Sequence, residues 1–368
     1  MPFRPRSRRL LPAALLLPVL LAACAVSPLE GKRADQAAVY TLYHHTADAR
    51  YNFSGESRLT SLHVPGKRGE EEAALLQEVA GSFHMQYDGA VDMAQHRVEL
   101  IPTLRFARPN AEAWVRFPLL LQLDTLTLYL DASAADLWLP ALSHKLVKFQ
   151  LPEDKLREIP VAAVLADLPD IVQRVYSAVE KKAYSYQPLS SADEKLGARY
   201  RIRLALDPVA GRVLSRQMVA ELVNSLRSHG ASQQVLTVAQ RVLQGAESGQ
   251  FQQQSRTDLL VSSAGRLLAV EEQRSMALPG DDPLRFAFTT RLNISNDGKP
   301  VFTLHPVAAN VVDYREVKLP AWMTPPTPPA AAASAPGGVA PPQPAQPVPP
   351  AIKPKPGKPK KLLAPVMY

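Results

Sequence analysis

Apolar and polar residues alternate along two long stretches of this chain, and this alternation constrains the fold more than any other feature. The alternating runs are clearest at residues 51–59, 83–87, 98–106 and 284–294. A period of two is the period of a β-strand that buries one face. The sequence therefore predicts two blocks of mainly antiparallel strands, at about 51–150 and 255–318, with a different segment between them.

Turn and breaker residues refine the strand predictions. Asp88-Gly89 predicts a hairpin, because both residues tolerate positive φ. Pro102 removes a ladder donor and predicts an edge or bulged strand. A change of parity near Asp124 predicts a bulge or a strand covered on both faces. A turn at residues 296–298 leads into a further expected strand at 301–305.

The middle segment, about 152–250, changes to a helical period. Apolar residues recur every three or four positions at 171–179, at 214–226 and more weakly at 235–242. Pro169-Asp170 is expected to open the first of these helices, and Gly230 to end the second. Between the first two helices, residues 200–206 alternate as a strand with one apolar face.

Strands, then helices, then strands again predict an α+β fold in one body domain, residues 51–320. The expected architecture is a large curved antiparallel sheet, similar to a half-barrel, with a few amphipathic helices on its concave side. This pattern resembles the Lol-type lipoprotein carriers and the mycobacterial lipid-binding lipoproteins. That resemblance implies acyl chains held between sheet and helices.

The second face of the strand at 200–206 carries Arg199, Arg201 and Arg203. One interpretation is a solvated sheet face. The other is a site for an anion or a lipid headgroup, because guanidinium offers planar bidentate donors. Trp114, Trp138 and the leucines at 119–130 are expected to build core rather than to line an acyl pocket.

The net charge of +8 lies at the two ends of the chain. Four arginines precede residue 10 and five lysines follow residue 352, so residues 24–320 are close to neutral. A nucleic-acid-binding domain needs basic charge clustered on a folded face. The charge distribution therefore predicts no nucleic-acid partner.

Four arginines at positions 4, 6, 8 and 9 precede an apolar stretch of twelve residues, 10–21, which is too short to span a bilayer. The stretch ends in Leu21-Ala22-Ala23-Cys24, and residues 1–23 therefore resemble a bacterial lipoprotein signal peptide. Cys24 is also the single cysteine, which excludes a disulfide framework. The alternatives are an ordinary secretory signal and an uncleaved anchor. Residues 24–50 are expected to hold a linker and a first strand.

In the lipoprotein family, the cysteine at this place carries a diacylglyceryl group and usually a third acyl chain. More than one chain gives stable membrane anchoring. Ala25, rather than aspartate, favours the periplasmic face of the outer membrane by the family's sorting rule. The predicted location is therefore the envelope of a Gram-negative bacterium, with the covalent lipid at Cys24 in place of any cofactor.

Residues 321–368 contain 15 prolines and no acidic residue. Proline removes backbone donors and fixes φ, so this segment is expected to be a disordered spacer. Its five lysines leave two interpretations open. It is either a plain solvated tail or a contact with an envelope protein, peptidoglycan or anionic lipid.

No catalytic motif of the common hydrolase, nucleotide or metalloprotease types occurs, so no enzymatic activity is expected. His84 and His96 flank the expected hairpin and with Asp92 form one metal-site alternative, but surface or half-buried structural histidines are favoured. Asp281 and Asp282 in a turn form a second alternative, for calcium, which is also not favoured. His44 and His45 are expected on a strand. The predicted function is a structural or interaction lipoprotein, and the alternative is a carrier with an apolar pocket between sheet and helices.

The proposed anchor gives a direct prediction. Cys24→Ser should leave an unprocessed precursor that lacks acyl chains, because serine cannot accept the diacylglyceryl group. Mass spectrometry of the protein from the native envelope measures this. A normally processed, membrane-bound mature form of the variant would contradict the prediction.

Overall fold

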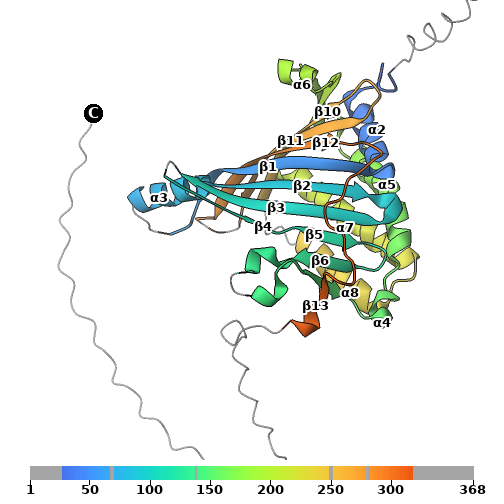
Figure 1. The fold of residues 1–368 in the computed structure, drawn as a ribbon. Helices are drawn as coiled ribbons and strands as arrows, with labels where there is room; N and C mark the ends of the chain where they lie inside the picture. The colour runs from blue at the N-terminus through green and yellow to red at the C-terminus, as the bar shows by residue number, and fades with distance from the viewer. Residues whose placement is uncertain are drawn as a thin grey trace, which may run out of the picture. The chain divides into compact units, whose positions relative to one another are not determined.

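The computed structural model describes residues 27–66, 70–108, 110–136, 139–247, 252–278, 280 and 282–317. Thirteen strands in these residues form one sheet (Figure 1). In sheet order they are β13 (Val311–Asp313), β7 (Leu146–Gln150), β6 (Thr127–Asp131), β5 (Leu119–Gln122), β3 (Arg97–Arg108), β2 (Phe83–Asp92), β1 (Arg50–His63), β12 (Arg285–Ser295), β11 (Leu267–Ala277), β10 (Gln252–Val261), β9 (Tyr200–Leu206) and β8 (Tyr184–Gln187). Strand β4 (Ala111–Arg116) pairs with β3 outside this order.

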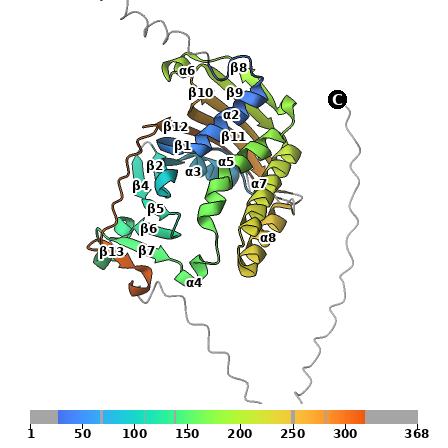
Figure 2. The same ribbon diagram turned by 90° about the vertical axis from the view of Figure 1, so that its right-hand side faces the viewer.

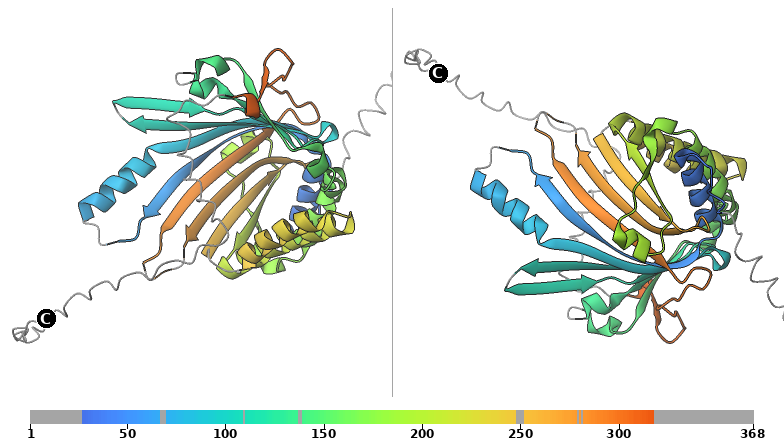
Figure 3. Two further views of the ribbon diagram at one scale, coloured as in Figure 1. Left: turned by 90° about the horizontal axis from the view of Figure 1, so that it is seen from below. Right: turned by 90° about the horizontal axis from the view of Figure 1, so that it is seen from above.

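The sheet is antiparallel except where β13 runs parallel to β7. It curves, and helices lie on its concave side (Figures 2 and 3). These helices are α2 (Ala34–Ala47), α5 (Val161–Ser177) and α7 (Pro208–Ser228), while α8 (Gln233–Glu247) lies against α7. The α+β prediction, with a large mainly antiparallel sheet and helices packed on it, is confirmed.

The main core lies between the helices and the end of the sheet formed by β8 to β11. Ile202 of β9 and Val261 of β10 are fully buried there, together with Ala37 and Ala38 of α2. The two alanines let the helix backbone approach the sheet closely. We call the face that meets the helices the inner face, and the opposite one the outer face.

Strand register assigns the residues of every strand to one of these faces. Leu259, which pairs with Ile202, lies in register with Val270 of β11 and Leu292 of β12. Beyond them, Gly55 of β1 pairs with Leu292. Because side chains alternate along each strand, all positions of this parity share the inner face.

Two inner-face glycines are covered by aromatic rings of the neighbouring strand. Gly89 lies under the ring of Phe53, and Gly55 lies under the ring of Tyr87. A Cβ at Gly89 would lie 2.3 Å from the ring of Phe53 and 2.3 Å from the Glu99 carbonyl oxygen. Glycine is therefore required here by close packing, and it leaves the strands free to bend.

The N-terminal part of the described chain differs from expectation. Residues 34–47 form helix α2, so His44 and His45 lie on a helix and not on a strand. Small residues on one side of α2 replace the bulky apolar stripe that marks most helices, and this explains why the sequence pattern did not reveal it. Helix α5 begins at Val161, so Pro169 lies inside it and does not open it. The second helix ends as expected, with Gly230 at φ 77°.

The turns of the first strand block also differ. Asp88-Gly89 is not a hairpin, because β2 continues to Asp92 and turns at the 3₁₀ segment Met93–Gln95, where His96 has φ 51°. His84 pairs with Arg105 near the other end of β2, so it cannot share a metal with His96 and Asp92. The parity change near Asp124 is a tight β5–β6 hairpin with Leu126 at φ 45°, not a bulge.

Pro102 marks a change of partner along β3. The pairing with β4 ends at Thr103, the pairing with β5 begins at Leu100, and the Pro102 carbonyl accepts the Phe117 N–H at 3.0 Å. Strand β3 is therefore paired on both sides and is not a sheet edge. Proline has no backbone N–H, and Pro102 lies between the end of the β4 pairing and the start of the β5 pairing, where no such donor is needed.

The strand expected at residues 301–305 is absent from the described structure. This segment crosses the outer face, where the buried carboxylate of Glu99 accepts the Thr303 N–H at 3.0 and 2.9 Å and the Leu304 N–H at 2.6 Å. Leu304 then packs against Leu120 and Leu146. A side chain thus replaces the partner strand that would have satisfied these backbone groups.

Gly89→Ala should lower the free energy of unfolding by about 1–3 kcal/mol, because the added methyl group meets a ring and a backbone oxygen. Gly245→Ala in α8 is the matched control, since a Cβ there meets nothing within 4 Å, and helix propensity makes the change neutral or stabilising. Urea unfolding of both variants measures this. Equal stability of the two variants would contradict the prediction.

Candidate functional site

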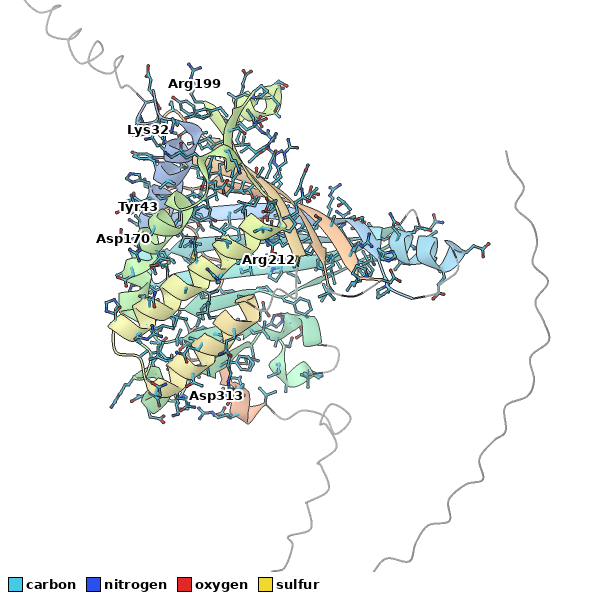
Figure 4. The ribbon with its side chains drawn as sticks, turned by 180° about the vertical axis from the view of Figure 1, so that it is seen from behind. Lys32, Tyr43, Asp170, Arg199, Arg212 and Asp313 are labelled. Carbon is cyan, nitrogen blue, oxygen red and sulfur yellow. The ribbon has the colours of Figure 1, made fainter. Side chains whose placement is uncertain are left out.

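The three arginines singled out by the sequence lie on the outer face of β9 or directly before it. Arg199 precedes the strand and its N–H donates to the Val261 carbonyl at 2.7 Å. Figure 4 shows its side chain at the end of the sheet where α2 begins. Arg201 and Arg203 lie within β9 and face β10.

Carboxylates already occupy the guanidinium groups of Arg201 and Arg203. Asp258 of β10 accepts from Arg201 Nη2 at 2.7 Å and from Arg203 Nε at 2.7 Å. Arg201 also donates to Asp193 of α6 (Ser191–Lys195) at 2.9 Å and to Glu271 of β11 at 2.6 Å. The cluster therefore joins β9, β10, β11 and α6.

Burial and charge act in opposite directions on these groups. Asp258 is only 5% exposed. Burial favours its neutral form, but hydrogen bonds from Arg203 and Arg201 outweigh this and hold the pKa of Asp258 below its ordinary value. Burial likewise opposes the charge of Arg201, yet its carboxylate partners raise the pKa of Arg201. Arg201 and Arg203 are thus mostly covered and paired within the chain, rather than spread over an open solvated face. Binding of an external anion or headgroup by Arg199, Arg201 and Arg203 stays a prediction.

A different surface stands out on the inner face. Several large apolar side chains there are more than a third exposed: Phe83 38%, Met85 45%, Leu104 41% and Phe149 37%. Phe83 pairs with Phe106 and Met85 with Leu104, so these residues are neighbours across β2 and β3. Phe83, Met85 and Leu104 lie toward the end of the sheet that extends past the inner helices to α3 (Glu70–Gly81) (Figure 1). Phe149 lies in register with Val91 at the other end of the strands.

A cavity of about 930 Å³ lies at the opposite end of the same face, between the sheet and helices α2 and α5. Its apolar lining includes Val91, Leu165, Leu168, Leu267 and Ile294. Tyr40, His45, Tyr51 and the paired Arg266 and Asp297 add polar groups. Ligand sites of proteins have this size and combine apolar walls with polar groups. Here polar and charged residues, among them His44, Asp48, Arg50 and His96, also line the cavity.

Two aromatic groups of the cavity, His45 and Tyr51, are neutral at physiological pH. Burial lowers the pKa of His45 to about 4 and raises the pKa of Tyr51 to about 12. The two rings stack with centroids 4.5 Å apart. This part of the wall therefore presents uncharged rings to anything that enters the cavity.

The residues predicted to build core, Trp114, Trp138 and the leucines at 119–130, are not all buried. Trp114 lies on the outer face of β4 and is 66% exposed, so the core prediction is wrong for it. Among the described residues, its short strand pairs only with β3. Trp138 lies outside the described residues. Of the leucines, Leu120 is fully buried, and Leu119, Leu121, Leu128 and Leu130 lie half-buried on the inner face.

Cys24, the signal segment 1–23 and the tail 321–368 lie outside the described residues. Within the residues that the structure describes, no helix is long and apolar enough to cross a membrane. In the same part of the chain, no three His, Cys, Asp or Glu side chains form a group that could hold a metal ion.

Comparisons with known proteins add no identification. No family model matches the chain, and no curated protein and no solved structure was found to be similar to it.

The outer-face cluster predicts a pH-dependent stability. Asp258→Asn should lower the free energy of unfolding by about 2–4 kcal/mol at pH 7, because two half-buried cations lose their shared carboxylate. Since the pKa of Asp258 is lowered in the folded state, its contribution is complete above the ordinary pKa of aspartate, near 3.8, and is lost as pH falls below that value.

Urea unfolding at pH 7, 5 and 3 measures the effect. The difference between the variant and the natural chain should be the same at pH 7 and 5 and smaller at pH 3. Glu153→Gln, which removes an exposed partner of Arg157, should change stability by less than about 1 kcal/mol. A difference for Asp258→Asn that does not change with pH would argue against the assignment.

Proposed function

We propose that this protein is an envelope lipoprotein whose body binds the acyl chains of a lipid on the inner face of its sheet. The observation that carries the proposal is the row of exposed apolar side chains, Phe83, Met85 and Leu104, on a face that curves inward. Soluble surfaces rarely leave a contiguous apolar row uncovered unless something binds there.

The apolar inner face extends over many strands. In register across β3, β5, β6 and β7, residues Val98, Leu121, Leu128 and Phe149 continue it to one side. On the other side, Leu59 of β1 lies opposite Phe288 of β12. Such a face removes apolar area from water along the whole length of an extended hydrocarbon chain.

The chemistry of the lining favours an acyl chain over a polar metabolite. The walls are aliphatic and aromatic, and the cavity between α2, α5 and the sheet has room for part of a flexible chain. Among the polar groups there, His45 and Tyr51 are stacked rings, and Arg266 is paired with Asp297. These four side chains offer a strongly charged ligand no free counter-charge.

The anchor and the binding face complement each other. A covalent lipid at Cys24 would hold the body beside a membrane, which is the source of acyl lipids. Because no similar chain was found, support for the carrier function comes from the geometry of this chain alone.

An interaction function is the second candidate, and one observation favours it. Strand β4 pairs only with β3, and its outer-face Trp114 is exposed. A partner protein could add a strand to the free edge of β4 and cover the indole ring. In that case the inner face would retain no lipid during purification.

Met85→Glu should weaken the binding of N-phenyl-1-naphthylamine, an apolar fluorescent probe, by about tenfold or more, because a carboxylate then lies in the apolar row. Gln86→Glu is the matched control: the neighbouring residue receives the same charge on the outer face. Fluorescence titration of the full chain carrying Cys24→Ser measures both.

The Gln86→Glu control should bind the probe with the same affinity as the chain that carries only Cys24→Ser. Native mass spectrometry of protein purified without delipidation should also detect a retained lipid in the natural chain. No probe binding by the chain with an intact inner face, or equal loss in both glutamate variants, would exclude the proposal.

A further inference from the structure

A charged pair interrupts the apolar inner face near its middle. Arg274 of β11 donates from Nε to Glu272 Oε1 at 3.0 Å and from Nη2 to the same oxygen at 2.5 Å. Both residues have inner-face parity, because Glu272 lies opposite Thr290 and Arg274 lies opposite Phe288. Their side chains are 18% and 33% exposed.

Hydroxyl groups continue this feature across the neighbouring strands. Ser57 Oγ of β1 and Thr290 Oγ1 of β12 lie 2.8 Å apart in a hydrogen bond, and Tyr87 of β2 interacts with both. Thr257 of β10 lies opposite Glu272. We call these residues the inner polar band: Ser57, Tyr87, Thr257, Glu272, Arg274 and Thr290.

The band has the parity of the face that meets the helices. Tyr176 of α5, which is half-buried, feels its charges: burial raises the pKa of Tyr176, and the charges of Glu272 and Arg274 act on it as well. The guanidinium of Arg274 also lies 5.8 Å from the ring centroid of Phe288. The pair is thus held among aromatic rings and not on the solvated outer face.

Along β12 the band separates two apolar zones. Ile294 and Leu292 lie toward the cavity, Thr290 belongs to the band, and Phe288 and Phe286 lie beyond it. At about 3.3 Å per residue, Ile294 and Thr290 are roughly 13 Å apart along the strand. A ligand with one polar group and a long apolar part fits this order.

Placing an ion pair on an apolar face costs desolvation free energy, and a bound hydrocarbon chain makes no hydrogen bond that would offset this cost. Two of its atoms have no hydrogen-bond partner in the described residues: Arg274 Nη1, a donor, and Glu272 Oε2, an acceptor. Together they match a neutral group that both accepts and donates. A carboxylate, in contrast, would meet the charge of Glu272.

We propose that the inner polar band binds the ester and hydroxyl groups of a neutral acyl ester, with Arg274 Nη1 donating to the carbonyl oxygen and Glu272 Oε2 accepting from a hydroxyl. This inference rests on the proposed acyl-chain binding and gives its ligand class: acylglycerol-type lipids in preference to free fatty acids. Arg274 and Glu272 are then the specificity-determining residues.

Displacement of N-phenyl-1-naphthylamine by monolauroylglycerol and by laurate tests this in the full chain carrying Cys24→Ser. The ester should compete about tenfold better than the acid, the factor that one charge-assisted hydrogen bond provides. Glu272→Gln removes the opposing negative charge and should raise the affinity for laurate about tenfold. Arg274→Met should lower the affinity for the ester by a similar factor, relative to the affinity of the same variant for the probe.

Glu271→Gln is the matched control, because Glu271 is the adjacent residue, is also ion-paired, and faces outward toward Arg291. It should leave the order of the two ligands unchanged. Arg274→Lys, which keeps the charge and loses the forked donors, covers the case in which Arg274→Met does not fold.

The assignment of the band would be overturned if ester and acid displaced the probe equally well from the chain that carries only Cys24→Ser. It would also be overturned if Glu272→Gln changed the affinity for both ligands equally. Failure of the probe to bind at all would instead overturn the proposed function, so the two failures are distinguishable.

Discussion

The separation of apolar and polar side chains between the two faces of one curved sheet is the constraint on which the rest of this structure depends. From β9 across to β7, positions of one parity share the inner face and are mostly apolar outside the inner polar band. A single shift in register would exchange the faces. Close packing of Phe53 on Gly89 and of Tyr87 on Gly55 makes such a shift costly in the middle of the sheet.

The two faces of the sheet differ in how their side chains are shielded from water. On the outer face, charges compensate one another, as Arg201 and Arg203 do with Asp258, and a backbone segment is bound by Glu99. On the inner face, α2, α5 and α7 cover one end of the strands and leave Met85 and Leu104 exposed at the other. The ion pair of Glu272 and Arg274 is the exception, since it lies among apolar residues.

The strand pattern made most of the sheet predictable, since a period of two in residues 83–87 or 284–294 needs no tertiary information. Local signals failed where a distant contact decided the outcome. Asp88-Gly89 stays within β2 because both residues have partners in β1 and β3. Residues 301–305 are not a strand because Glu99 satisfies their N–H groups. Helix α2 was missed because alanines carry its contact with β9.

The candidate site shows the same division. The arginines at 201 and 203 could be placed on one face from sequence, but their partners Asp193, Asp258 and Glu271 are distant along the chain. The sequence by itself determined which residues of each strand share a face, because side-chain alternation is a local property of the backbone. Only the tertiary structure decided which of those residues remain uncovered and which charges meet, because coverage and pairing depend on where helices and neighbouring strands come to lie.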